Sequence, residues 1–462
     1  MQLCKGDRNN VIGVCWLSVI KTLGGKNMAT LNTTYGYNES DFAKFKSYAS
    51  RALWSFAFLY MFVYNARQNI HYALPLLKEG FGVGNLETGI ITSSLFWCYG
   101  FGHFLSGRLS EIFTIKRFII LGTILSILCN FFISFQTTLT GIAILWGLNG
   151  FAQSMIWSPG FGMLAQWWPK KTRGHSTSIA TTSATVAQIV TPLCIVWSLD
   201  HFGQTWQNCF RWPLVPTVFA LIVFALCAKD KPADVGLAPF AEDDDDHKAI
   251  EESRQKMLKE HGKLYPYWAL IREPKFICFV FIIMIGGLGR YGLLTWIPNY
   301  FKQSMGLSIK SGIVKSLLLP LGYGIANFSL PRISDKVFKG KREPILIINS
   351  IMTCLLLCLF PFVKTAQGAT ILLLFIGFFS CTNSMVWSFA TDIGTRAISG
   401  TASGILDWAS YMGAAIQAIF FGYIWDKTNS AVSVFVTIGV LYAIMCGLAF
   451  LAKGIKIRGD NR

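Results

Sequence analysis

Twelve apolar segments dominate this sequence and restrict what it can fold into. A helix needs about twenty apolar residues to cross the roughly 30 Å hydrocarbon core of a bilayer. Runs of that length occur at roughly residues 52–73, 86–109, 117–136, 139–165, 176–199, 210–228, 275–300, 311–333, 344–363, 367–391, 399–422 and 431–453. Charged residues make up only 14% of the chain, whereas about a quarter is usual in a soluble protein. The sequence predicts an all-α membrane protein with twelve spans.

The positive charge of the chain lies mostly in short loops between the apolar segments. A net charge of +17 would suggest nucleic-acid binding in a soluble protein, but cytoplasmic loops of membrane proteins are also rich in Lys and Arg. Bases gather after the even-numbered segments, for example at 170–173 and 336–342. We therefore expect a cell inner (plasma) membrane protein, with both termini cytoplasmic and no nucleic-acid partner.

A long polar stretch divides the chain into two halves. We expect a cytoplasmic N-terminal segment at 1–50, six-helix bundles at 51–228 and 275–453, a cytoplasmic linker at 229–274 and a tail at 454–462. Residues 1–27 lack the cleavage-like end of a signal peptide, and Met28 offers a second start. The acidic run 243–246 beside His247 could bind a metal, but such runs are usually solvated. We predict no metal, no cofactor and a monomer.

The two halves share landmarks in the same order. Arg67 precedes Pro75 by eight residues, as Arg290 precedes Pro298. The acid of a Ser-acid motif follows each arginine after 44 or 45 residues, at Glu111 and at 335. The pentapeptide at 154–158 (SMIWS) returns at 384–388 as SMVWS. Gly174 has a partner in Gly400. These four landmarks, at offsets between 223 and 230, indicate an internal duplication.

An arginine within an apolar span requires a reason, since a charge at the bilayer centre costs about 2.5–3.5 kcal/mol on insertion scales. Arg67 and Arg290 occupy equivalent places in spans 1 and 7. Guanidinium groups remain charged and bind phosphate or carboxylate through two parallel hydrogen bonds. We interpret the pair as a clamp for an anion. Each arginine could instead pair with an acid or reach an interface, but Asp407 is the one plausible intramembrane acid.

Other polar side chains could contribute to the same site. Tyr64 lies three residues before Arg67, on the same helical face. His103 could add a titratable donor, although a histidine bonded to a neighbouring hydroxyl is nearly as good an interpretation. Tyr411 is a weaker candidate, because aromatic residues in such helices usually only pack.

Charged loops at the ends of spans 2 and 8 have a different predicted role. Arg108 and Glu111 follow span 2, and Arg332 and Asp335 follow span 8. Ion pairs between helices at these places can hold one conformation and must break when the halves rock. We predict that these four residues take part in gating.

Several stretches resemble the major facilitator superfamily, and within it the organophosphate:phosphate antiporters. The stretch 107–111 (GRLSE) is similar to the superfamily's loop 2–3 motif. Similarity to bacterial glycerol-3-phosphate and hexose-phosphate carriers is found at 64–69 (YNARQN), 99–101 (YGF), 166–168 (QWW), 290–292 (RYG), 334–340 (SDKVFKG) and 400–404 (GTASG). The resemblance covers roughly 50–455. It implies the major facilitator fold, with two pseudo-symmetric six-helix bundles and with Arg67 and Arg290 as phosphate ligands.

The sequence departs from these carriers where the organic part of the substrate would be recognised. His103 stands where glycerol-3-phosphate carriers have a lysine, and Ala184 stands in place of their span 5 histidine. Thr295 and Pro320 replace an expected aspartate and glutamate. Ser403 and Leu406 replace the span 11 aspartate and lysine of hexose-phosphate carriers. The resemblance therefore leaves the organic substrate open.

We expect a secondary transporter, not an enzyme, that exchanges a phosphate ester such as glycerol-3-phosphate or a hexose phosphate for inorganic phosphate. Besides these anionic small molecules, its partner would be membrane lipid. A receptor of the same fold that binds a sugar phosphate without transporting it is one alternative. A proton-coupled symporter of an organic anion, with His103 or Asp407 carrying the proton, is another.

Overall fold

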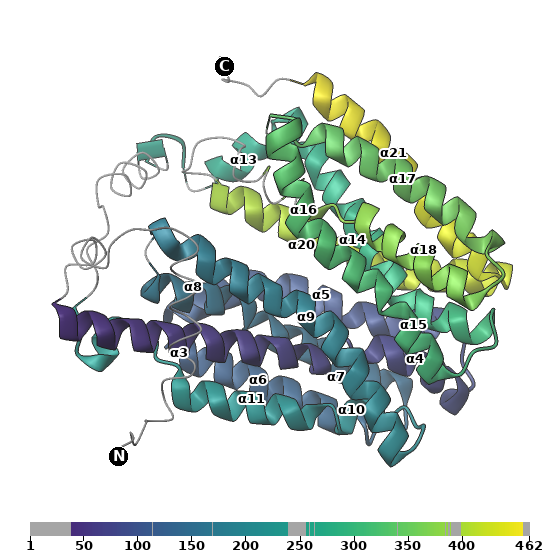
Figure 1. Ribbon diagram of the computed structural model, residues 1–462, viewed down its shortest axis with the longest axis horizontal. Coiled ribbons are helices and arrows are strands. Elements are labelled where there is room, and N and C mark those ends of the chain that lie inside the picture. The colour runs from purple at the N-terminus through teal and green to yellow at the C-terminus, as the bar shows by residue number, and fades with distance from the viewer. Residues whose placement is uncertain are drawn as a thin grey trace, which may run out of the picture.

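The protein is helical throughout the part described by the computed structural model, which comprises residues 38–455 except 113, 169, 239–255, 258, 263, 340, 384, 387–388 and 390–398. The helices form two bundles, one from each half of the chain (Figure 1). Most of the predicted linker, including the acidic run 243–246 with His247, lies outside the described residues, as do residues 1–37.

The first half contains six spans, three of which are divided. Span 1 consists of α3 (Glu39–Val63), η1 (Tyr64–Ala66) and α4 (Asn69–Phe81), and span 2 is α5 (Asn85–Ile112). Span 3 is α6 (Ile115–Ile133), span 4 is α7 (Leu139–Ser154) with α8 (Trp157–Trp167), and span 5 is α9 (Lys170–Phe202). Span 6 joins α10 (Asn208–Arg211) to α11 (Leu214–Cys227), and η2 (Pro232–Val235) follows it.

The second half repeats this order after the short α13 (Tyr265–Ile271). Span 7 is α14 (Pro274–Gln303), span 8 is α15 (Ile309–Ser316) with α16 (Leu318–Val337), and span 9 is α17 (Glu343–Leu359) with η3 (Phe360–Phe362). Spans 10 to 12 are α18 (Ala366–Phe379), α20 (Ser399–Thr428) and α21 (Ala431–Gly454). By length and composition, eight of the described helical segments could each cross a membrane. The predicted all-α architecture of twelve spans is confirmed.

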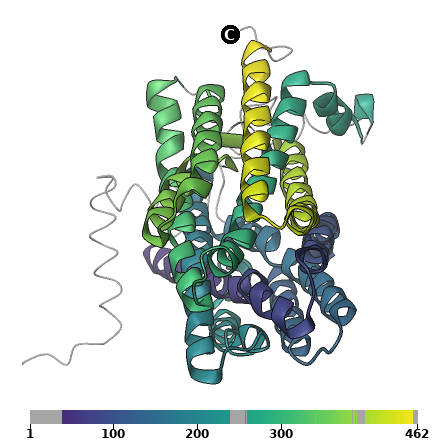
Figure 2. The ribbon, with the colours of Figure 1, turned by 90° about the vertical axis from the view of Figure 1, so that its right-hand side faces the viewer.

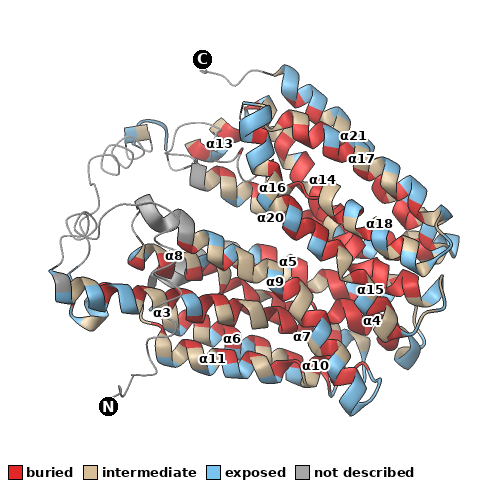
Figure 3. Ribbon diagram, viewed as in Figure 1, coloured by how far each residue is buried: buried red, intermediate tan, exposed pale blue. Residues whose placement is uncertain are grey.

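The outward faces of the bundles are apolar. Exposed Leu, Ile, Val and Phe side chains run along the outer helices, among them Leu125 of α6, Phe219 of α11, Ile351 of α17 and Ile444 of α21. Figure 3 colours these outer faces as exposed or intermediate, while the faces between helices are buried. A soluble monomer rarely exposes continuous apolar surface on this scale, and such a surface is typical of a protein that spans a membrane.

Span 1 is interrupted just before Arg67. Backbone groups released by a break inside a membrane need partners from the protein. The carbonyl of Ala66 accepts hydrogen bonds from the side-chain amides of Asn130 (2.9 Å) and Asn149 (2.7 Å). The hydroxyl of Thr217 donates to the carbonyl of Phe62 at 2.7 Å. These buried polar side chains from three other helices stabilise the break and fix the backbone of Arg67.

The two halves meet along α5 and α20, which cross closely at glycines. At Gly89, a Cβ atom would lie only 2.1 Å from the carbonyl oxygen of Ala418, and at Gly422 it would lie 2.5 Å from that of Asn85. The Ser93 hydroxyl donates to the Ala415 carbonyl at 2.8 Å. Hereafter the side of the molecule holding the α4–α5, α14–α15 and α20–α21 turns is called the distal side, and the side where α3 begins is called the termini side. Figure 2 gives a second view of the two bundles.

Polar contacts close the distal side. The Asp426 carboxylate of α20 accepts hydrogen bonds from the backbone N–H groups of Asn85 (3.0 Å) and Leu86 (2.7 Å) at the start of α5. A carboxylate suits a helix N-terminus, where the first N–H groups lack partners and the helix dipole is positive. Ion pairs also join Glu79 to Lys302 and Asp200 to Lys310. Among the described residues, hydrogen bonds and ion pairs between halves lie at the level of Arg67 or closer to the distal side.

Candidate functional site

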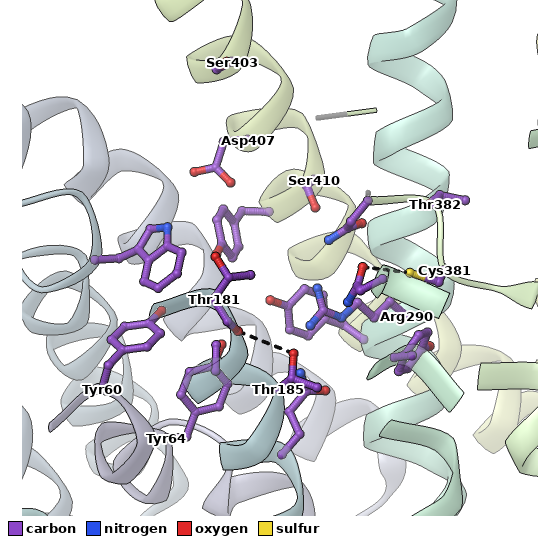
Figure 4. Close-up of a pocket in the computed structure, with 18 of the residues that line it drawn as sticks. Tyr60, Tyr64, Thr181, Thr185, Arg290, Cys381, Thr382, Ser403, Asp407 and Ser410 are labelled. Atoms are coloured by element: carbon purple, nitrogen blue, oxygen red, sulfur yellow. Dashed lines mark hydrogen bonds between the residues drawn. The ribbon is translucent and has the colours of Figure 1, made fainter. Parts of the chain in front are cut away.

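A cavity of about 630 Å³, lined by both aromatic and polar side chains, lies between the two halves. Figure 4 shows it bounded by side chains from both bundles. The first half contributes Tyr60, Tyr64, Trp157, Ser158, Phe161, Thr181, Ala184, Thr185 and Gln188. The second contributes Arg290, Tyr291, Tyr323, Asn327, Ser380, Cys381, Thr382, Asn383, Ser403, Gly404, Asp407, Ser410 and Tyr411. Its many hydroxyl and amide groups suit a polar solute.

Arg290 lines this cavity from α14. Its guanidinium carbon lies 5.6 Å from the ring centre of Tyr291 and 5.7 Å from that of Tyr323. Such distances place the charge within reach of the negative faces of both rings. The Nε of Arg290 is buried and has no hydrogen-bond partner among the described residues. The group therefore retains unused donors beside the cavity.

Arg67 adjoins the cavity behind two of its lining tyrosines. It is 6% exposed, and its Nη2 donates a hydrogen bond to the Tyr411 hydroxyl at 3.2 Å. Its guanidinium carbon lies 4.1 Å from the ring centre of Tyr99, 5.5 Å from Tyr411 and 5.8 Å from Tyr64. The predicted neighbours Tyr64 and Tyr411 thus both contact Arg67. Tyr411, the weaker candidate from sequence, connects the halves.

Neither arginine pairs with an acid among the described residues. Within the part of the chain that the structure describes, Arg67 and Arg290 form no ion pair, and Asp407 makes neither a hydrogen bond nor an ion pair. Burying unpaired charges is costly, so an anion placed between the two guanidinium groups would stabilise them. The two arginines and Asp407 come from three segments of the chain: α14, α20 and the break in span 1.

His103 lies next to the cavity residues Ser158 and Tyr411. Its Nδ1 is 3.2 Å from the Ser158 hydroxyl, and its ring centre is 6.0 Å from that of Tyr411. Its Nε2 is buried without a hydrogen-bond partner among the described residues. The sequence offered two interpretations of His103, as a structural residue bonded to a hydroxyl and as a donor to the ligand. A ring with one nitrogen beside a hydroxyl and the other without a partner among the described residues fits both.

The structure describes the side chains of two of the four predicted gating residues, Asp335 and Arg332. Asp335 forms an ion pair with Arg342 at 2.7 Å, between α16 and the start of α17, and so within the second half. The Arg332 guanidinium donates to the Phe328 carbonyl of its own helix at 3.4 Å. Arg108 and Glu111 lie in α5, but their side chains are outside the described residues. The role of all four residues in gating stays a prediction.

Sequence reasoning missed the residues that hold the halves together on the distal side. Glu79 and Lys302 are 223 positions apart, as are Arg67 and Arg290. Because this offset relates equivalent places in the two halves, it could have identified Glu79 and Lys302 as a pair across the pseudo-symmetry axis. Tyr99 and Tyr323 are 224 positions apart and each lies beside one of the arginines. Asp426 offered no such signal, because it contacts backbone rather than a charged partner.

The positions that depart from known carriers differ in their surroundings. Ala184 and Ser403 line the cavity. Thr295 is fully buried, and its hydroxyl lies 3.0 Å from His71 Nδ1 at the contact between halves. Pro320 and Leu406 are buried. Only the first two therefore shape the space available to a ligand.

Known proteins resemble this chain along most of its length. A probable hexose phosphate transport protein from Chlamydia trachomatis is 26% identical over 399 residues, covering 82% of this chain and 85% of the relative. The glycerol-3-phosphate transporter of Bacillus subtilis is 25% identical, covering 79% and 84%. The membrane sensor protein UhpC of Escherichia coli is 24% identical, covering 77% and 81%.

Solved structures agree on the fold. A bacterial homologue of the human lysosomal transporter Spinster, in an inward-facing and unoccupied conformation, matches with a TM-score of 0.72 at 13% identity, covering 88% of this chain and 98% of that one. A D-xylose–proton symporter matches with a TM-score of 0.64. The family model of the Major Facilitator Superfamily matches residues 56–418. With this match, the twelve spans and the cavity between the halves, the chain belongs to the Major Facilitator Superfamily and is a membrane transport protein rather than an enzyme.

Proposed function

We propose that this protein exchanges a phosphate monoester, of the hexose phosphate or glycerol-3-phosphate kind, for inorganic phosphate. One observation carries the proposal: Arg67 and Arg290, at equivalent places in the two halves, lie beside one cavity without an acidic partner among the described residues. Relatives named as transporters of hexose phosphate, glycerol-3-phosphate and phosphoglycerate support the choice of anion.

The electrostatics of the site explain why exchange would be favoured. Two guanidinium groups repel each other in an empty site, which opposes closure of the halves on the termini side. A bound phosphate group attracts both, so the loaded protein can reorient. Inorganic phosphate and a monoester share the group that Arg67 and Arg290 would bind. Each can therefore be carried across the membrane in exchange for the other.

The closed distal side supports an inward-facing assignment. If the basic loops lie in the cytoplasm, as the positive-inside rule predicts, the termini side is cytoplasmic and the cavity is reached from there. The same rule supports cytoplasmic termini, with six-helix bundles at 51–228 and 275–453 connected by a cytoplasmic linker. The hydrogen bonds of Asp426 and the pairs Glu79–Lys302 and Asp200–Lys310 would then form the external gate.

Reconstitution into liposomes tests the proposal. Vesicles loaded with phosphate should take up labelled glucose-6-phosphate or glycerol-3-phosphate, whereas vesicles without internal phosphate should take up little. Uptake driven by a pH gradient alone, with no need for internal phosphate, would contradict exchange and indicate a proton symporter. Stabilisation of the purified protein by the esters without any flux would instead indicate a receptor, as in the relative named a membrane sensor.

Replacing Asp426 with asparagine should weaken the external gate. The change removes the charge from two hydrogen bonds to backbone N–H groups of α5, and hydrogen bonds to charged groups contribute about 1.5–3 kcal/mol each. We expect the outward-open population to rise by about tenfold or more. Spin labels at Gln204 and Gln367, both exposed and one in each half, would report a longer distance in the variant.

The matched control is Glu343→Gln, which breaks the ion pair between Glu343 and Lys275, both in the second half. It should leave the distance between the two labels unchanged. A distance distribution in Asp426→Asn identical to that of the wild type would contradict a gating role for this carboxylate.

A further inference from the structure

Among the described residues, one carboxylate, that of Asp407, lines the cavity, at a different level from the arginines. Asp407 and Ser403 lie on the face of α20 that also carries Tyr411, the hydrogen-bond partner of Arg67. Asp407 precedes Tyr411 by four positions in α20, so at 1.5 Å per residue the carboxylate lies about 6 Å closer to the termini side. Figure 4 shows Asp407 directed into the space between the halves, on the side where Thr181 lies.

The position of Asp407 would orient a phosphate ester. Phosphate and carboxylate repel each other, so the phosphate group would be held at the level of Arg67 and Arg290 and kept away from Asp407. The organic part would then point toward the termini side, against Asp407, Ser403 and Thr181. An ionised carboxylate accepts hydrogen bonds and donates none. It therefore favours a donor, and best of all a cation, on the organic part.

The charge balance of the site also favours a cation on the organic part of the ester. Arg290 and Asp407 are the charged residues among those that line the cavity in the described chain, and Arg67 adjoins it. Together the three groups carry a formal charge of +1. A phosphate dianion alone would leave the charge of Asp407 unmatched. An ester with one ammonium group carries a net charge of −1, as does the inorganic phosphate monoanion, and either would balance the site.

We propose that Asp407 makes the site selective for phosphate monoesters with an ammonium group on the organic part, and against those with a second anionic group there. This inference rests on the proposed function for the placement of the phosphate group. The Asp407 carboxylate would bind the ammonium directly, while Ser403 and Thr181 would bind neighbouring hydroxyls. Both exchanged ligands would then cross with the same net charge.

Two matched pairs of esters test this selectivity by competition for binding to the purified protein. Glucosamine-6-phosphate and glucose-6-phosphate differ only by an amino group in place of a hydroxyl. Glycerol-3-phosphate and 3-phosphoglycerate differ by a carboxylate. In the wild type, the amino ester should bind about tenfold more tightly than its partner, and the carboxylated ester about tenfold more weakly, as expected when a buried charge gains or lacks a partner.

Asp407→Asn should bring both affinity ratios close to one, because the amide keeps the shape of the side chain and loses its charge. Asp407→Glu should keep both preferences in the same direction. Ser403→Ala, one turn away on the same face, should alter the two members of each pair alike. Equal affinities within each pair in the wild type, or ratios unchanged in Asp407→Asn, would overturn the inference.

The measurement separates this inference from the proposed function. Competition requires binding alone, so the ratios can be measured even in a protein that does not exchange phosphate. Loss of phosphate exchange with both preferences intact would refute exchange and support the role of Asp407. Exchange with no preference in either pair of esters would support the proposed function and refute the role of Asp407. If Asp407→Asn does not fold, the two wild-type ratios and Asp407→Glu still decide the matter.

Discussion

Alanine at Arg67 or at Arg290 is expected to reduce phosphate exchange in liposomes by about a hundredfold or more. Removing one partner of a buried charge pair costs about 2–5 kcal/mol, and each 1.4 kcal/mol corresponds to a factor of ten. The loss should be similar at both positions because the two arginines occupy equivalent places in the halves. Exchange is measured as uptake of labelled phosphate by phosphate-loaded vesicles, with parallel measurement of phosphate binding.

Lysine at either position should retain partial activity, because it keeps the charge and loses the planar fork that binds phosphate through two hydrogen bonds. Arg211→Ala provides a matched control. Arg211 is also partly buried, but it donates to the hydroxyl and carbonyl of Ser134 in the first half, away from the cavity. It should lower stability and leave phosphate affinity unchanged. Exchange that survives in Arg67→Ala or Arg290→Ala would refute the anion clamp.

Alanine at Gly89 is expected to prevent closure of the distal side. Its Cβ would lie 2.1 Å from the Ala418 carbonyl oxygen, well inside the 3.0 Å that real Cβ atoms essentially never cross. The neighbour is backbone of α20, in the other half, so the two halves must separate to relieve the clash. Overpacking of this kind costs about 1–3 kcal/mol or more. We expect spin labels at Gln204 and Gln367 to move apart and exchange to fall by about tenfold or more.

Gly413→Ala is the matched control for Gly89→Ala. There the Cβ would also lie 2.1 Å from a carbonyl oxygen, that of Met284, but both helices, α14 and α20, belong to the second half. Because this clash lies within one half, it is present in both the inward-facing and the outward-facing conformation. It should therefore lower the melting temperature without moving the labels apart. Gly447→Ala, with no neighbour within 4 Å, should be neutral. Wild-type distances and wild-type exchange in Gly89→Ala would contradict a closed distal side as part of the transport cycle.

The sequence determined the architecture because the bilayer permits few solutions. Spans of about twenty apolar residues must be helical, since no water is present to satisfy their backbone. The duplication then related Arg67 to Arg290 and implied a shared site. Both residues adjoin the cavity, as do the predicted neighbours Tyr64 and Tyr411. These conclusions depended on residue type and spacing along the chain, which the sequence displays directly.

The tertiary structure decided what depends on contacts between distant segments. The sequence predicted one helix through span 1, yet the chain breaks at Tyr64–Ala66 because Asn130 and Asn149 satisfy the freed carbonyl of Ala66. It offered no sign of Asp426, whose carboxylate joins the two halves on the distal side by accepting hydrogen bonds from backbone N–H groups of α5. The gating role of Glu111 and Asp335 stays a prediction. The sequence indicated Asp407 as an intramembrane acid that could carry a proton, and the fold placed this carboxylate in the cavity, one helical turn from the residue that binds Arg67. A contact between two helices depends on their depth and rotation, and the packing of the two halves sets both.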